Sequence, residues 1–131
     1  MGTKAIVARP DENGGFAGRI VLNDGEPQYA IEILRSCVHY VTSGDVADAA
    51  RLLIDEHPAG WIDLPDADSD GRCLCHGAQI ANGPASTELR TDQSSAGGEV
   101  EFVYVLHPDR LQILAPGQDG WQETSCAPWT D

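Results

Sequence analysis

The sequence predicts an α+β fold, in which an antiparallel β-sheet carries a two-helix hairpin packed on one face. Three observations lead to this prediction: two strand-like runs around a Gly-rich turn, two helical segments joined by a tight connection, and several strand-like runs in the second half. The order ββαα followed by strands groups the helices on one face of a sheet. The chain has 131 residues and no linker-like segment, so we expect a single domain, 1–131.

The first two strands are expected to form a hairpin. Lys4–Ala8 contains the β-branched Ile6 and Val7, which favour a strand, and Phe16–Leu22 continues a strand-like pattern. Residues 10–15, between the two runs, are dense in turn formers. Two strand-like runs on either side of a Gly-rich turn are typical of an antiparallel pair.

A helix over residues 27–42 is the clearest element of the sequence. Pro27 suits the first helical turn, because its missing N–H costs nothing there. Apolar residues recur with helical spacing and form one stripe: Ala30, Ile33, Leu34, Cys37, Val38 and Val41. This stripe predicts that Cys37 is buried, and Gly44 is placed to end the helix.

A second helix is expected directly after Gly44. Asp45 can cap it, and Asp48 in its first turn complements the positive end of the helix dipole. The connection is so short that the two helices must form a hairpin or corner. Trp61 follows at the start of a strand-like run and is expected in the core.

The second half is predicted to be mostly strands. Val100–Leu106 has the strongest strand pattern of the chain, and it returns through a Pro-containing turn as Leu111–Leu114. Three short strands and one further strand complete the expected sheet: Gly60–Leu64, Arg72–Cys75, Thr87–Thr91 and Trp121–Ser125.

The chain is strongly acidic, with 21 Asp and Glu against 8 Lys and Arg and a formal net charge of −13. Such a surface repels phosphates, so direct binding to nucleic acid or to an anionic membrane is disfavoured. The longest apolar run, Phe102 to Leu106, is too short to cross a bilayer. No secretory signal pattern opens the chain, so we expect a cytoplasmic protein.

The charge is concentrated in residues 41–71, where one Arg stands against eight Asp and Glu and the net charge is −7. One interpretation is a solvated surface that keeps the protein soluble, and the other is a surface that engages a basic partner. In the second interpretation, the residues expected to face the partner are Asp45, Asp48, Asp55, Glu56 and Trp129. Trp129 is either an interface anchor or a terminal residue folded back onto the domain.

An Asp-rich segment is the first candidate for a metal site. Asp66, Asp68 and Asp70 precede Gly71 at alternate positions, as ligands do in the first half of an EF-hand-type calcium loop. The second half departs from that pattern, because its twelfth position is Gly77 and not Glu. The alternative is a solvated acidic turn whose carboxylates accept local N–H groups.

A second candidate metal site follows directly. Cys73, Cys75 and His76 could supply two or three ligands to Zn²⁺, with His107 or Cys126 as the only later additions. The cysteines have one residue between them, whereas zinc knuckles usually have two. The alternative is a pair of packed or partly exposed free thiols. Disulfides are not expected without a secretory signal.

Segments of the first half resemble a group of small uncharacterised actinobacterial and actinophage proteins: Met1–Pro10, Gly18-Arg19, Asn23–Pro27 and Leu52–Trp61. Those proteins open with Met-Gly-Thr-Arg and carry a Trp-Asp-Gly-Tyr-Pro turn before their first helix. This chain departs from the pattern at Asn23 and Glu26, where the group has aromatic residues. The resemblance implies a cytoplasmic protein carried on a phage or mobile element, and it implies no activity.

The function predicted from these features is a small acidic cytoplasmic protein-binding or regulatory factor. One version is a mimic of nucleic acid, whose carboxylates imitate phosphates in the basic cleft of a partner. The alternative is a metal-binding protein, or a metal- or Cys-dependent enzyme, centred on Asp66 to His76. No Walker loop, nucleophile elbow or His-Glu-x-x-His motif is present, so the sequence favours a binding protein over an enzyme.

Overall fold

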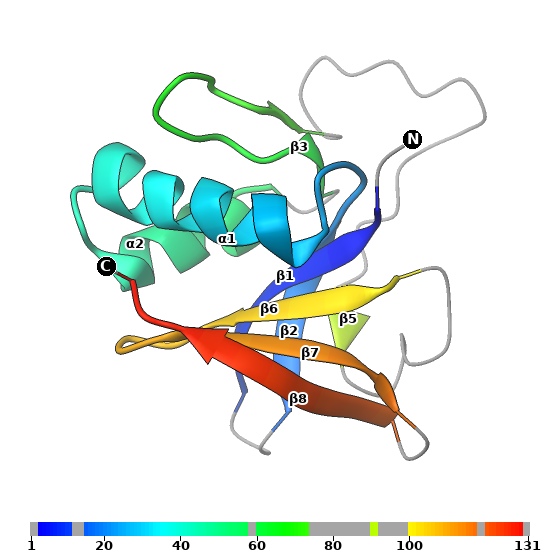
Figure 1. Cartoon of the computed structure of the whole chain (residues 1–131). Coiled ribbons are helices and arrows are strands. Elements are labelled where there is room, and N and C mark those ends of the chain that lie inside the picture. Colours follow the sequence, from blue (N-terminus) through cyan, green and yellow to red (C-terminus); the bar gives the residue numbers. More distant parts are fainter. Residues whose placement is uncertain are drawn as a thin grey trace, which may run out of the picture.

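The computed structural model describes residues 3–11, 15–57, 60–73, 90–91, 100–117 and 120–129. Within these ranges, strands form one eight-stranded sheet in the order β4-β3-β2-β1-β6-β7-β8, and β5 pairs with β2 (Figure 1). The strands are β1 (Ala5–Pro10), β2 (Phe16–Val21), β3 (Trp61–Asp63), β4 (Arg72–Cys73), β5 (Arg90–Thr91), β6 (Phe102–Leu106), β7 (Leu111–Gly117) and β8 (Gly120–Ala127). The helical segments are α1 (Pro27–Ser36), η1 (Cys37–Val41), α2 (Val46–Ala50) and η2 (Arg51–Asp55).

The predicted antiparallel sheet with a helix hairpin on one face is wrong, because the sheet is mixed. Strand β1 runs parallel to β6, from the pair Ala5 and Phe102 to the pair Ala8 and Val105. Strand β2 runs parallel to β3. The helices therefore lie between β2 and β3 in the chain. They form the crossover connection that two parallel neighbouring strands require. The α+β class itself, the β1–β2 hairpin and the β6–β7–β8 meander match the expectation.

Strand β1 lies between β2 and β6 in the middle of the sheet, and both of its faces are buried. Ala5 and Val7 face the helices and belong to the larger core cluster, which also contains apolar residues of all four helical segments. Ile6 and Ala8 face the opposite side, in a second cluster built from strand residues and Val100. This two-sided burial explains why β1 reads as a continuous apolar run.

The first helix begins at Pro27 as predicted, but its last turn is wider than an α-helix. The Thr42 N–H donates to the Cys37 carbonyl at 3.2 Å, a bond that spans five residues and defines the π-helical turn η1. A π-helical turn rotates each following residue by less than an α-helix does. Val41 consequently leaves the buried stripe and is 42% exposed, which corrects its predicted burial, whereas Cys37 is buried as expected.

The second helix is capped as predicted and also ends in a π-helical turn. The Asp45 side chain accepts a hydrogen bond from the Asp48 N–H, and the Glu56 N–H donates to the Arg51 carbonyl across five residues. The Trp61 ring lies in the core, as expected, and its Nε1–H donates to the Leu53 carbonyl at 2.9 Å. None of the helices in the described ranges is long and apolar enough to cross a bilayer.

Candidate functional site

The Asp-rich segment forms a tight turn between β3 and β4. The Asp66 N–H donates to the Ser69 carbonyl at 2.9 Å, and the Asp66 carboxylate accepts from the Asp68 N–H at 2.9 Å. The Ala67 N–H donates to Ser36 Oγ at 2.9 Å, and this bond holds the turn against the C-terminal end of α1. Asp66 is thus occupied in stabilising the turn, while the side chains of Asp68 and Asp70 are exposed.

The metal predictions receive no geometric support from the residues that the structure describes. In these ranges no group of three or more His, Cys, Asp or Glu side chains lies close enough to hold a metal ion. Cys75 and His76 lie outside the described residues, and of Cys73 only the backbone is described. The zinc and calcium sites therefore stay predictions.

The exposed side of the first helix lies beside this turn. Tyr29 is 50% exposed and Tyr40 is 66% exposed, and the exposed Glu32 lies one helical turn after Tyr29. We call Tyr29, Glu32, Tyr40, Asp68 and Asp70 the helix–turn face. Within the described ranges, none of its three carboxylates forms an ion pair with Lys or Arg.

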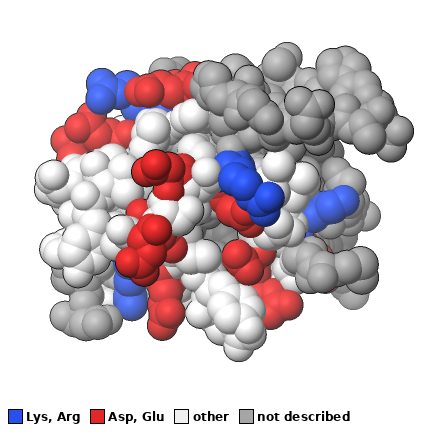
Figure 2. Space-filling model, turned by 90° about the horizontal axis from the view of Figure 1, so that it is seen from above, with Lys and Arg blue, Asp and Glu red and all other residues white. Residues whose placement is uncertain are grey.

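Figure 2 shows the molecule from above, the side on which the β3–β4 connection lies in Figure 1. Asp and Glu side chains are spread across this face in separate groups, with fewer Lys and Arg side chains among them. The surface is acidic and discontinuous, because uncharged residues separate the groups. It can attract a basic molecule over a distance, while close contact would involve the uncharged side chains as well.

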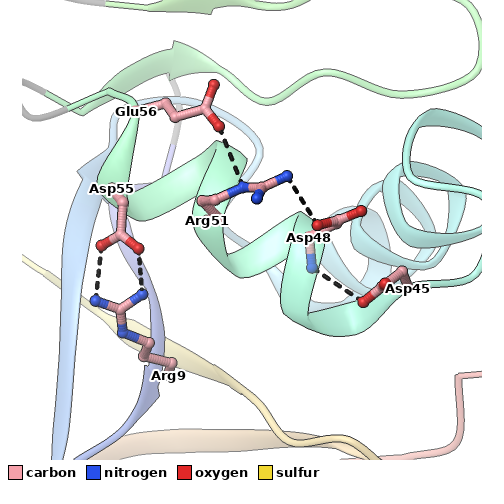
Figure 3. Close-up of polar contacts among 6 residues, drawn as sticks. All are labelled: Arg9, Asp45, Asp48, Arg51, Asp55 and Glu56. Atoms are coloured by element: carbon pink, nitrogen blue, oxygen red, sulfur yellow. Dashed lines mark hydrogen bonds and ion pairs between the residues drawn. The ribbon is translucent and has the colours of Figure 1, made fainter.

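The acidic residues of the second helix form an internal network with arginines (Figure 3). Arg51 lies between two carboxylates, with its Nη2 2.8 Å from Asp48 Oδ1 and its Nε 3.4 Å from Glu56 Oε2. Asp45 Oδ1 accepts the Asp48 N–H at 3.1 Å, as a helix cap does. Asp45 has no Lys or Arg partner in the described part of the chain.

Asp55 joins the end of this helix to the sheet. Arg9 at the end of β1 donates two hydrogen bonds of 2.6 Å to the two carboxylate oxygens of Asp55 (Figure 3). These bonds, and then the attraction to Arg9, hold the pKa of the Asp55 carboxyl below its ordinary value. The Arg19 Nε–H donates to the Ile54 carbonyl at 2.9 Å, and burial lowers the Arg19 pKa. Of the four predicted partner-facing carboxylates in 45–56, three are thus paired with arginine.

A groove of about 710 Å³ lies beside the Arg9–Asp55 pair, open to solvent. One wall is the start of α2 with the turn before it, and the others are the end of β1 and the residues at and after the end of β6. The lining residues are mainly apolar: Pro10, Val46, Ala47, Ala50, Leu106 and Pro108, with Ser43, Gly44 and the charged Arg9 and Asp45. The groove therefore lies at the carboxyl ends of two parallel strands.

The turn before α2 has a defined backbone conformation that shapes this wall. Ser43 and Gly44 have φ values of 56° and 87°, in the left-handed region. The Thr42 hydroxyl lies 3.0 Å from the Val38 carbonyl and 2.9 Å from the Asp45 carbonyl, and the Gly44 N–H donates to the Val38 carbonyl at 2.7 Å. These bonds fix the position of Asp45 relative to the first helix.

Sequence reasoning identified Asp45 but missed the groove. Its walls come from three segments that are far apart in the chain, and no motif or spacing links Pro10 and Leu106 with Ala47. The parallel pairing of β1 with β6 brings two of these segments together, and the packing of α2 in the same core cluster as β1 and Leu106 adds the third. The Ser43-Gly44 turn was the one local signal available, and it marks a helix end as readily as a binding site.

Trp129 is packed against the larger core cluster and is half-buried. Its Nε1–H donates to the His107 carbonyl at 2.7 Å, and the Arg35 Nε–H donates to the Pro128 carbonyl at 2.7 Å. Of the two interpretations left open by the sequence, this geometry favours a residue folded back onto the domain.

Comparison of the chain with protein-family models, with curated proteins and with solved structures gives no match.

Proposed function

We propose that this protein is a small acidic protein-binding factor of the cytoplasm, and that its partner presents a basic surface to the helix–turn face. The observations that carry the proposal are two exposed tyrosines, Tyr29 and Tyr40, and the Ala67–Ser36 hydrogen bond that joins their helical segment to the turn with the exposed Asp68 and Asp70. Tyrosine is enriched at the energetic centres of protein interfaces. Uncompensated carboxylates raise the rate of encounter with a cationic partner.

The pairing within the second helix supports this choice of surface. Asp48, Asp55 and Glu56 are each bound to Arg9 or Arg51, so their charge is already matched within the chain and attracts a cationic partner less. Asp68 and Asp70 are exposed and form no ion pair with a described Lys or Arg. We therefore place the main contact on the helix–turn face and not on 45–56.

Affinity capture from cells that naturally produce the protein tests the proposal. The wild-type chain is compared with the double variants Tyr29→Ala/Tyr40→Ala and Asp68→Asn/Asp70→Asn, each at low and high salt. We expect a basic protein that is captured at low salt, largely lost at high salt, and reduced by both double variants. Asp109→Asn is the matched control, because Asp109 lies in the β6–β7 turn and pairs with its neighbour Arg110.

The same experiment tests the nucleic-acid mimic as the more specific form of the proposal. If the captured partner binds duplex DNA, and added DNA displaces it from this protein, the carboxylates occupy a nucleic-acid cleft. Capture that is equal for the wild type and both double variants would exclude the helix–turn face as the contact. Capture that is insensitive to salt would contradict the electrostatic part of the proposal.

A further inference from the structure

We infer that the groove at the carboxyl ends of β1 and β6 is a second contact site, which receives an apolar side chain of the partner next to a Lys or Arg that faces Asp45. The inference rests on the proposed function, because it takes the occupant to be a segment of the basic partner. It adds a separate surface, made of different residues from those of the helix–turn face.

The size and lining of the groove suit an apolar side chain. Its volume of about 710 Å³ falls in the range of known binding pockets, which are mostly apolar with a few placed polar groups. Val46, Ala47 and Leu106 contribute apolar surface from opposite walls. The groove is open, so a peptide segment can cross it with one apolar side chain seated against these walls.

The charges at the groove select a cation. Arg9 lines the groove, but both of its terminal nitrogens are bound to Asp55, so its charge is already compensated. Asp45 also lines the groove, and one of its oxygens accepts the Asp48 N–H. No Lys or Arg of the described ranges pairs with Asp45. An ammonium or guanidinium group at the rim would therefore be attracted to the Asp45 carboxylate, whereas an anion would be repelled.

The walls of the groove are held in place before any ligand binds. The Arg9–Asp55 pair fixes the end of β1 to η2, and the Thr42 hydroxyl fixes the turn that carries Asp45. A preformed site loses little conformational freedom on binding, which favours affinity.

A library of random linear dodecapeptides displayed on phage is the probe, panned against the immobilised full chain. We expect enriched sequences that share an apolar residue adjacent to Lys or Arg. A synthetic peptide of the most enriched sequence should then shift the backbone amide resonances of residues 43–47 and of Leu106. Binding should weaken as salt increases.

Variants of two exposed groove residues, Ala47 and Asp45, test the location. Ala47→Trp obstructs the groove from its rim. It should weaken the binding of the peptide by about tenfold or more, a loss of about 1.4 kcal/mol. Ala47→Lys tests the same position by charge, because its flexible side chain carries an ammonium group that repels a cationic peptide. Asp45→Asn keeps a capping oxygen and removes the charge, and should weaken binding by about threefold at low salt and less at high salt. Gln122→Trp on the exposed edge strand β8 is the matched control and should bind like the wild type.

The outcomes separate this inference from the proposed function. If no sequence is enriched, or if the peptide binds Ala47→Trp and Ala47→Lys as tightly as the wild type, the groove is not a peptide site. If the shifts fall around Tyr29 and Tyr40 and spare the groove, the helix–turn face stands and this inference is overturned. Circular dichroism and thermal melting of each variant verify that the fold is retained.

Discussion

Arg9 and Asp55 are 46 residues apart in sequence, and they form a two-point ion pair between the end of the central strand β1 and the end of the second helix. Both donor–acceptor distances are 2.6 Å. The pair joins β1 to the last helical residue of the crossover between β2 and β3, and it lies beside the groove. Its two side chains are 39% and 43% exposed, so water and salt weaken the attraction.

The first prediction concerns the contribution of this pair to stability. Arg9→Met and Asp55→Asn should each lower the free energy of unfolding by about 0.5–1 kcal/mol, because an exposed ion pair contributes little even with good geometry. Urea unfolding of the wild type, both single variants and the double variant measures the coupling. The double variant should be less destabilised than the sum of the single variants, and a coupling of zero would show that the pair adds nothing.

The second prediction is the pH dependence of the same pair. Because the folded-state pKa of Asp55 is below its ordinary value of 3.8, the stabilisation is present above that value and is lost as the pH falls through the folded pKa. The difference in stability between the wild type and Asp55→Asn should therefore be constant from about pH 5 to 7 and shrink on acidification. Urea unfolding at a series of pH values measures it. A difference that persists undiminished at pH 2 would exclude ionised Asp55 as its cause.

The local elements were predictable, because each depends on residues close together in the chain. Pro27 and Gly44 bracket the first helical region, and the Val100–Leu106 pattern marks β6. Sheet order was not predictable. The parallel pairing of β1 with β6 joins residues such as Ala5 and Phe102, and parallel strands have no tight turn between them to signal the contact. The predicted burial of Val41 was wrong for a different reason. The prediction used α-helical spacing, whereas the chain forms a π-helical turn at this position.

In the candidate site, too, the features that depend on nearby residues were predictable and those that depend on the tertiary fold were not. The cap at Asp45 follows from the residue type and its position before a helix. The ion pairs that occupy Asp48, Asp55 and Glu56 depend partly on Arg9, which only the tertiary fold brings near. Counting charges along the chain therefore overstated how many carboxylates of this segment are free for a partner.

The third prediction concerns Trp61, whose buried Nε1–H donates to the Leu53 carbonyl. Trp61→Phe removes the donor and some buried volume, and should lower the free energy of unfolding by about 1–3 kcal/mol. Trp129→Phe is the matched control, because it loses a similar bond to the His107 carbonyl at a half-buried position and should cost less. Urea unfolding followed by far-ultraviolet circular dichroism measures both. Equal losses would contradict the central place of Trp61 in the core.

The fourth prediction compares two cysteines. Burial, with a smaller effect of Asp66, raises the pKa of the Cys37 thiol to about 11, whereas Cys126 is exposed. Because the thiolate is the reactive form, Cys37 should react with a disulfide reagent at pH 8 at least about 100-fold more slowly than Cys126. The measurement uses variants that keep one of these cysteines and replace the other three by Ser. Similar rates in the two variants would show that Cys37 is accessible, and equal rates in denaturant are the control.

The fifth prediction separates the two roles of Asp45, as helix cap and as charge at the groove. Asp45→Ala removes the oxygen that accepts the Asp48 N–H and should lower the free energy of unfolding by about 1 kcal/mol. Asp45→Asn retains a capping oxygen, so it should unfold within a few tenths of a kcal/mol of the wild type. Thermal and urea unfolding of the two variants measure the difference. If Asn destabilises as much as Ala, the carboxylate stabilises the helix through its charge and not through the cap, and Asp45→Asn could no longer isolate the effect of charge on binding in the groove.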